Sequence, residues 1–198
     1  VGSYASPGNA NGLTLSGSRL YVADGSAGLR ILDVSSPAAP AELGFYDTPG
    51  DARDVKIADA YAYIADGNAG LRVIDISNPA TPTEVGALDV SGTSCARALV
   101  ISGSITYVTV DYGGLLVVDI SHPVAPATLS SYPPINRGTW GSMTDIVIDN
   151  GYVYVTEAEI EYRDDLDLFR HGGGLRIIDV TDPMKPAWVG FCDTPGSP

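Results

Sequence analysis

The chain has 198 residues, of which 44% are hydrophobic and 18% are charged, and its formal net charge is −13. Such an acidic surface repels nucleic-acid phosphates and anionic lipid head groups, which argues against both as partners. Two cysteines are too few for a disulfide framework, and no run of 18 apolar residues exists that could span a bilayer. The 23 glycines, 14 prolines and 11 tyrosines, with apolar residues biased to Val, Ile, Leu and Ala, indicate an all-β protein.

One segment recurs four times along the chain. Each copy has a glycine, an apolar run that ends in aspartate, and a turn closed by proline: Gly28–Pro40, Gly70–Pro82, Gly114–Pro126 and Gly174–Pro186. The marker aspartates of these copies are spaced by 42, 44 and 60 residues: Asp33, Asp75, Asp119 and Asp179. Self-similarity at this period indicates a tandem repeat in which each unit is one supersecondary structure.

Within the second unit, turn-forming residues separate four short segments: Asp54–Ala58, Tyr61–Ala65, Leu71–Ile76 and Thr83–Leu88. The third segment does not alternate between apolar and polar residues, so we expect both of its faces to be covered. A four-stranded sheet packed between two similar sheets meets this condition, as in a β-propeller blade. The sequence therefore predicts an all-β propeller fold of four tandem, four-stranded antiparallel repeats. An all-β solenoid is the alternative, although its coils are usually shorter.

The third-strand segment Leu71–Asp75 (LRVID) and its three copies resemble the LVIVD repeat family, and the likeness extends over nearly the whole chain. The resemblance implies a β-propeller of the kind found mostly on surface proteins of bacteria and archaea. It therefore implies an extracellular or cell-surface location in a prokaryote. It brings no catalytic residues.

The repeat units run over about 1–42, 43–84, 85–128 and 129–188 of a single domain, and the start of a fifth unit lies at 189–198. Val1–Tyr4 (VGSY) aligns with the fourth-strand segments Leu43–Tyr46 (LGFY) and Val189–Cys192 (VGFC). If four blades closed into a ring, the outer strand predicted at Val1–Tyr4 would lack a third strand to pair with, and free strand edges promote aggregation. We therefore expect a segment of a larger propeller of roughly six to eight blades, or a ring that a second chain completes.

The fourth unit is 18 residues longer than the second. Five of the extra residues lie in the link before its first strand, between Leu129 and Ile146, and 13 lie between its second and third strands, from Tyr154 to Leu175. In an antiparallel sheet both links emerge at the same edge. We therefore expect one blade to carry a protrusion of two loops on the face where propellers usually bind ligands.

These two insertions supply the candidate binding residues. The shorter insertion contributes Asn136, Arg137 and Trp140, and the longer contributes Glu157, Glu159, Glu161, Tyr162, Arg163, Asp164, Asp165, Asp167, Phe169, Arg170 and His171. Aromatic residues beside arginine are typical of protein-binding hot spots, which favours a protein partner or self-assembly, but the same aromatic residues could form a small core within the loop. The carboxylates that could bind Ca²⁺, an ion that takes about six to eight oxygen ligands, are Glu159, Glu161, Asp164, Asp165 and Asp167. The alternative is a solvated acidic loop, and no other cofactor is indicated.

Three functions are open at this point. Carboxylates near His171 could act as acid and base in a metal-assisted hydrolase or lyase, but the sequence has no catalytic motif such as G-x-S-x-G or H-E-x-x-H. We therefore expect a non-enzymatic scaffold that binds a protein, or assembles with its own copies, through the fourth unit. A purely structural set of blades is the remaining alternative.

The recurring polar residues are expected to be structural. The aspartates that end the third strands should accept N–H bonds from the turns that follow, and Asp24 and Asp66 should do the same in Asp-Gly turns. The recurring arginines are expected to form salt bridges between blades: Arg30, Arg72 and Arg176. His122 is expected to be a turn residue. Spacing alone does not show whether Cys95 pairs with Cys192.

Overall fold

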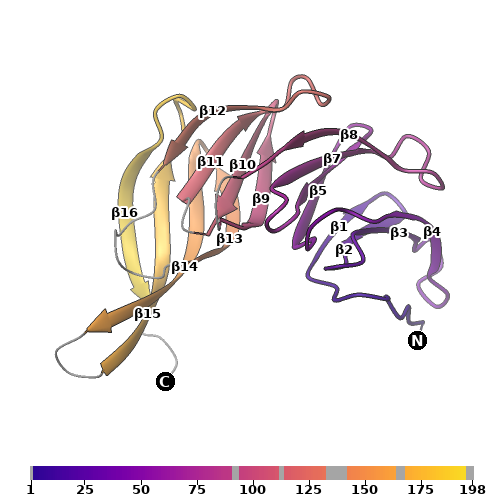
Figure 1. The fold of residues 1–198 in the computed structure, drawn as a ribbon, viewed down its shortest axis with the longest axis horizontal. Helices are drawn as coiled ribbons and strands as arrows, with labels where there is room; N and C mark the ends of the chain where they lie inside the picture. Colours follow the sequence, from indigo (N-terminus) through magenta and orange to yellow (C-terminus); the bar gives the residue numbers. More distant parts are fainter. Residues whose placement is uncertain (1, 91–93, 112–113, 133–141, 164–167, 195–198) are drawn as a thin grey trace.

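The computed structural model describes residues 2–90, 94–111, 114–132, 142–163 and 168–194 (Figure 1). Within these ranges the chain forms 16 β-strands and no helix, and hence no helix that could cross a membrane. The strands build four separate antiparallel sheets, each from four consecutive strands. The sheets follow one another around an open arc, with the first and the last sheet at its two ends (Figure 1).

The strands of the four sheets have the following bounds. Sheet 1 contains β1 (Gly12–Ser16), β2 (Arg19–Ala23), β3 (Leu29–Asp33) and β4 (Ala41–Tyr46). Sheet 2 contains β5 (Asp54–Ala58), β6 (Tyr61–Ala65), β7 (Leu71–Asp75) and β8 (Thr83–Leu88). Sheet 3 contains β9 (Ala96–Ser102), β10 (Ile105–Val110), β11 (Gly114–Asp119) and β12 (Ala127–Tyr132). Sheet 4 contains β13 (Ser142–Asp149), β14 (Tyr152–Arg163), β15 (Leu168–Asp179) and β16 (Ala187–Thr194).

This arrangement confirms the predicted four-stranded units. The four strands expected in the second unit are β5 to β8, and the only difference is that β7 ends at Asp75 instead of Ile76. A solenoid would pair strands of successive repeats, whereas every ladder between the described strands joins strands of one repeat. The first strands of consecutive sheets are neighbours, because β1 contacts β5, β5 contacts β9 and β9 contacts β13.

The core consists of three apolar layers, each between two neighbouring sheets. β7 shows why its sequence does not alternate. Val73 and Ile74 are adjacent on this strand and both are fully buried. Ile74 belongs to the layer shared with sheet 1, and Val73 belongs to the layer shared with sheet 3. The prediction that both faces of the third strand are covered is therefore confirmed.

The aspartates that end the third strands each accept a backbone N–H bond from the residue two positions later. The donors are Ser35, Ser77, Ser121 and Thr181, at 2.8, 2.8, 2.8 and 2.9 Å. Hydrogen bonds to the charged carboxylate hold the pKa of all four aspartates below the usual value. The predicted turn role is confirmed. His122 also lies in such a turn, where its carbonyl accepts from the Ala125 N–H at 2.9 Å.

The outer strand predicted at Val1–Tyr4 is not formed. Val1 lies outside the described residues, and Gly2–Tyr4 belong to no ladder. A strand requires a hydrogen-bonded neighbour, and no described strand pairs with Gly2–Tyr4.

Candidate functional site

One edge of every sheet carries the links between consecutive sheets, and we call it the linker rim. At this edge the first and third strands begin and the second and fourth strands end, as shown in sheet 1 by the pairing of Gly12 with Ala23 and of Leu29 with Tyr46. In sheet 4, β13 begins at Ser142 opposite Ala158 of β14. The strand ends next to both insertions therefore lie on the linker rim, as predicted.

The longer insertion is mostly strand, which corrects the prediction of a loop. β14 and β15 have 12 residues each, whereas β6 and β7 have five. Beyond the body of the sheet, Ala158–Arg163 pairs with Leu168–Gly173. We call these two segments the ribbon; at about 3.3 Å per residue it extends roughly 20 Å. The alternation Glu-Ile-Glu-Tyr-Arg over 159–163 has the period of two that favours a strand, and this signal could have predicted the ribbon.

The ribbon brings some of the predicted site residues together. Its ladder places Tyr162 opposite Phe169, and Glu161 opposite Arg170. His171 lies opposite a residue that was not predicted, Ile160. The predicted residues that lie outside the described residues are Asn136, Arg137, Trp140, Asp164, Asp165 and Asp167. Ca²⁺ binding at Glu159, Glu161, Asp164, Asp165 and Asp167 stays a prediction.

The base of the ribbon is held by an ion pair. The Nε of Arg176 on β15 donates to Oε2 of Glu157 on β14 at 3.0 Å, and both side chains are more than nine-tenths buried. The Arg176 guanidinium also lies over the ring of Phe191 on β16, 5.6 Å from its centroid. Glu157 thus has a structural role at the point where the ribbon leaves the sheet.

The recurring arginines bridge strands within one sheet, so the prediction of bridges between blades is wrong. Arg30 on β3 pairs with Glu42 on β4 at 3.9 Å, and Arg72 on β7 pairs with Glu84 on β8 at 3.5 Å. The third and fourth strands are neighbours in each sheet, and paired residues on adjacent strands face the same side. The arginines therefore meet carboxylates of their own sheet before they can reach another.

The side chains of Asp24 and Asp66 accept hydrogen bonds from the linker that enters their sheet. The prediction that they accept from their own Asp-Gly turns is therefore wrong. The Gly50 N–H donates to Oδ2 of Asp66 at 2.8 Å, and the Thr48 hydroxyl donates to Oδ1 at 2.6 Å. Asp24 likewise accepts from the Gly8 N–H at 2.9 Å. Burial raises the pKa of Asp66 above its usual value, although these hydrogen bonds oppose the shift.

The opposite pKa shifts predict opposite pH dependences for two substitutions. Because the pKa of Asp66 is higher in the folded state, protonation of this side chain favours folding. This contribution to stability is fully present below the unfolded-state pKa of 3.8 and is lost as the pH rises through the folded-state pKa. Asp66→Asn, which mimics the protonated side chain, should therefore gain stability relative to the wild type between about pH 3 and about pH 7.

Asp75→Asn is the matched control, since the pKa of Asp75 is lowered from 3.8 by the Ser77 N–H and hydroxyl. This variant should lose stability relative to the wild type over the same pH range, because the Asp75 contribution is present above 3.8 and is lost as the pH falls through the folded value. Urea unfolding at several pH values measures both differences. The same sign for both variants would contradict the assignment.

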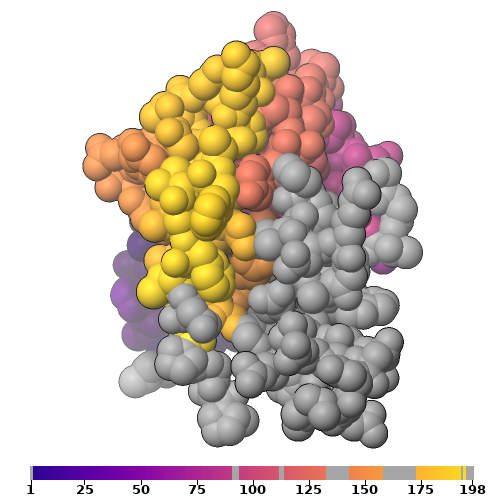
Figure 2. All heavy atoms as spheres, turned by 90° about the vertical axis from the view of Figure 1, so that its left-hand side faces the viewer, coloured from indigo at the N-terminus to yellow at the C-terminus, as the bar shows by residue number. Residues whose placement is uncertain are grey.

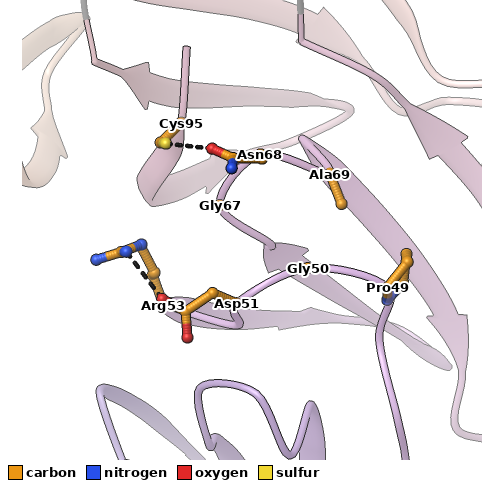
Figure 3. A pocket seen from close by; sticks show the side chains of 8 residues that line it. All are labelled: Pro49, Gly50, Asp51, Arg53, Gly67, Asn68, Ala69 and Cys95. Carbon is orange, nitrogen blue, oxygen red and sulfur yellow. Dashed lines mark hydrogen bonds and ion pairs between the residues drawn. The ribbon is translucent and has the colours of Figure 1, made fainter. Parts of the chain in front are cut away.

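A hollow of about 490 Å³ lies on the linker rim where sheets 2 and 3 meet (Figure 3). It is lined by the β4–β5 link, the β6–β7 turn and the residue before β9, namely Pro49, Gly50, Asp51, Arg53, Gly67, Asn68, Ala69 and Cys95. Two polar pairs are seen there: Arg53 with Asp51 at 2.8 Å, and the Cys95 thiol with Oδ1 of Asn68 at 2.5 Å (Figure 3). No disulfide joins Cys95 to Cys192.

The eight residues that line the hollow contain no nucleophile beside a base and no pair of neighbouring carboxylates. Among all described side chains, no group of three or more His, Cys, Asp or Glu could hold a metal ion. Sequence reasoning missed this hollow because its residues come from three separate segments and form no local motif. The polar side chains that line it place hydrogen-bonding groups on the linker rim.

The outer strand of sheet 4 carries the largest exposed apolar side chain of the sheet. Figure 2 shows β16 (yellow) at the surface at this end of the arc. Trp188 is 58% exposed on this strand, at the repeat position of Glu42 and Glu84. It pairs with Ile178, which is buried against sheet 3, so Trp188 lies on the face toward sheet 3. Sequence reasoning did not single out Trp188, although its departure from the repeat was visible.

The fold is similar to several solved structures. The computationally designed Ika4 protein is 14% identical, with a TM-score of 0.59 over 84% of this chain and 92% of Ika4. The designed Ika8 protein is 13% identical, with a TM-score of 0.57 over 95% of this chain and 62% of Ika8. The β-propeller domain of Cps50 (Swd1) from Myceliophteria thermophila is 11% identical, with a TM-score of 0.57 over 94% of this chain and 73% of that domain. The fold is thus that of β-propeller blades, as predicted.

At the level of sequence, no curated protein matches the chain. The profile of the LVIVD repeat matches residues 7–48, 49–90, 94–133 and 170–194. The stretch between the third and fourth matches, 134–169, contains most of the two insertions of the fourth unit. With four matches that span most of its length, the chain belongs to the LVIVD repeat family.

Proposed function

We propose that this chain is a non-enzymatic β-propeller scaffold that binds a protein partner, or another copy of itself, through its fourth sheet. The observation that carries the proposal is that, of the four described sheets, only sheet 4 has both an added ribbon and an exposed tryptophan on its outer strand. Sheet 4 has the ribbon where the other sheets have short turns, and it has an exposed tryptophan where sheets 1 and 2 have glutamate. A structural role would predict the same residues in every sheet, whereas recognition requires only one altered sheet.

The chemistry of this surface suits a protein. Trp188, Val189 and Phe191 are 58%, 51% and 44% exposed along β16. Large apolar side chains on a protein surface mark interaction sites, and tryptophan is among the residues most enriched in hot spots. No described strand pairs with β14 beyond Ala158, so this edge of the ribbon can accept a partner strand by main-chain hydrogen bonds.

The mechanism is preorganisation. The Glu157–Arg176 ion pair and the buried residues Val153, Val155 and Ile178 fix the strands from which the ribbon extends. A surface that is already ordered loses less conformational entropy on binding than a flexible loop does. The scaffold therefore contributes affinity by holding the fourth sheet in one conformation.

Two variants test this surface. In the first, Asn-Gly replaces Glu159–Gly172, because Ala158 and Gly173 are ladder partners that a two-residue type I′ turn can join. In the second, Trp188→Glu restores the residue found in sheets 1 and 2. We expect each variant to change the free energy of unfolding by less than about 1 kcal/mol. We expect each to raise the Kd for the partner at least about tenfold.

The partner is first identified by a photo-crosslinking residue at Tyr162, with the same residue at Ser36 on the opposite rim as the control. Isothermal titration with the purified partner then compares the wild type, the two variants and Phe45→Ala. Phe45 is a matched control because it is 50% exposed on β4 of sheet 1. Equal crosslinking from both rims, or an unchanged Kd in both sheet 4 variants, would contradict the proposal and favour a purely structural role.

We also propose an extracellular or cell-surface location in a prokaryote. Membership in the LVIVD family supports it, because the family's repeats occur mostly on bacterial and archaeal surface proteins. Labelling of intact cells with a membrane-impermeant reagent, read at this chain, is the measurement that checks it.

A further inference from the structure

Residues 2–8 lie on sheet 1 in the same way that the end of β4 and its linker lie on sheet 2. The first evidence is that the backbone of each segment, at a glycine, comes very close to the backbone of the sheet on which it lies. A Cβ on Gly44 would lie 2.3 Å from the carbonyl oxygen of Pro79 in sheet 2, and a Cβ on Gly2 would lie 2.6 Å from that of Pro37 in sheet 1. Each glycine lies 35 residues before its proline.

A tyrosine repeats the same relation two residues later. The Tyr46 hydroxyl donates to Oε2 of Glu84 at 3.4 Å, and the Tyr4 hydroxyl donates to Oε2 of Glu42. Burial and the bond to Glu42 raise the pKa of Tyr4 to about 12, and burial also raises the pKa of Tyr46. Tyr4 is therefore docked on sheet 1 and is not a free end.

The linker completes the correspondence. Gly8 donates its N–H to Oδ2 of Asp24 at 2.9 Å, and Gly50 donates its N–H to Oδ2 of Asp66 at 2.8 Å. These contacts extend from the glycine of the outer strand to the start of the next sheet. Residues 2–8 thus have the place and register of a fourth strand and its linker. No described strand pairs with them in the way that β3 pairs with β4.

Next to this segment, the described residues leave part of an apolar face of sheet 1 uncovered, at Leu13 and Leu15. Leu13 on β1 is 64% exposed, whereas Val55 and Leu99 at the same repeat position in sheets 2 and 3 are fully buried. Leu15 is 62% exposed. A hollow of about 530 Å³ lies over this face, lined chiefly by Leu13, Leu15, Leu20, Leu32, Val34 and Tyr4.

We infer that this face binds a three-stranded antiparallel sheet of the same repeat, to which residues 2–4 add as the fourth strand. The other interfaces show what this partner presents. Sheet 1 packs on Val55 and Ile64 of sheet 2 through Tyr21, Leu29 and Ile31. A tyrosine on its second strand and aliphatic residues on its third strand would cover Leu13 and Leu15 in the same way.

A second copy of this chain fits the face less well. Its open end is sheet 4, which already has a fourth strand, β16, with Gly190 at the repeat position of Gly44. A Cβ on Gly190 would meet nothing within 4 Å, so this end is open as well. Docking sheet 4 of one copy on sheet 1 of another would bring Gly190 onto Pro37, where Gly2 already lies. The inference concerns the end of the arc opposite the ribbon and does not depend on the proposed function.

Two fusions of the full chain separate a three-stranded from a four-stranded partner. Fusion A joins residues 49–84 directly to Val1, because Val1 aligns with Val85. These residues contain the first three strands of the second repeat and the first two residues of its fourth strand, which Val1–Tyr4 then continues. Fusion B joins residues 49–90, all four strands, to Val1 through a flexible Gly/Ser linker of about 15 residues. Hydrogen exchange of β1 and β2 is measured by mass spectrometry, and exchange of β10 and β11 reports the folding of the remainder.

We expect fusion A to slow exchange in β1 and β2 about tenfold or more relative to the unfused chain, because burial of Leu13 and Leu15 stabilises sheet 1. Fusion B should leave this exchange unchanged. Equal protection by fusion B would overturn the inference, and so would unchanged exchange in a fusion A whose β10 and β11 are protected.

If fusion A does not fold, the unfused chain carries the test. Gly2→Val places side-chain atoms against the Pro37 and Ala38 backbone, so it should release the segment and speed exchange of the Gly8 and Asn11 amides about tenfold. Ser3→Val, at an exposed position, should not do so. Unchanged exchange in the Gly2 variant would show that residues 2–8 are not held as a fourth strand.

Discussion

Leu99→Ala should lower the free energy of unfolding by about 2–5 kcal/mol, whereas Leu13→Ala should lower it by less than about 1 kcal/mol. Both leucines occupy the same position of the repeat, on the first strand of sheets 3 and 1. Leu99 is fully buried in the layer between sheets 2 and 3, and Leu13 is 64% exposed. The difference between the variants therefore measures what a neighbouring sheet contributes at one position.

Urea unfolding followed by tyrosine and tryptophan fluorescence measures both variants, and far-UV circular dichroism checks that the sheets remain. The residue type and the strand are the same in the two variants, so strand propensity cancels in the comparison. Equal losses of stability would mean that the layers between sheets do not stabilise the fold. A larger loss at Leu13 would mean that its face is covered in solution.

Gly44→Val should destabilise the chain by about 3 kcal/mol, while Gly190→Val should leave it within about 0.5 kcal/mol of the wild type. A Cβ at Gly44 would lie 2.3 Å from the Pro79 carbonyl oxygen, which belongs to backbone and cannot rotate away. A Cβ at Gly190, the same position in sheet 4, meets nothing within 4 Å. Valine also favours strands, so propensity cannot account for a loss at Gly44 alone.

Sheet 3 supplies an internal control for this prediction. It has Ser130 at the glycine position, and the hydroxyl donates to the Pro183 carbonyl of sheet 4 at 2.6 Å. Gly44→Ser should therefore cost less than Gly44→Val, because its hydroxyl can bond to the carbonyl that valine only obstructs. Thermal unfolding of the three variants ranks them. Equal melting temperatures for Gly44→Val and Gly190→Val would contradict close packing of β4 on sheet 2.

The sequence predicted the fold well because every local signal is repeated. The segment around Asp75 contains an apolar run without alternation, a strand end and a turn that captures the aspartate, and all three were found in the structure. Each of these signals is weak in a single copy, but four copies in the same order favour one fold over the rest. The exception, Gly2–Tyr4, has the sequence of an outer strand, but a ladder also needs a neighbouring strand that local sequence does not supply.

The candidate site was predicted less well, because its features depend on pairing between strands. The run from Glu157 to Arg163 was interpreted as an acidic loop from its charge, although its alternation favours a strand. Arg72 was assigned to a bridge between blades because its position in the sequence does not show which carboxylate it faces. Only the pairing of β7 with β8 places it beside Glu84. Cys95 and Asn68 are 27 residues apart, and no local motif predicts their contact.

The contacts between sheets 1 and 2 recur one repeat earlier, between residues 2–8 and sheet 1, with the same atoms in the same roles. A duplication or deletion of 42 residues consequently adds or removes a whole blade together with a finished interface, wherever in the repeat the crossover falls. Unequal recombination can then change the size of such a protein in single steps without new packing having to evolve.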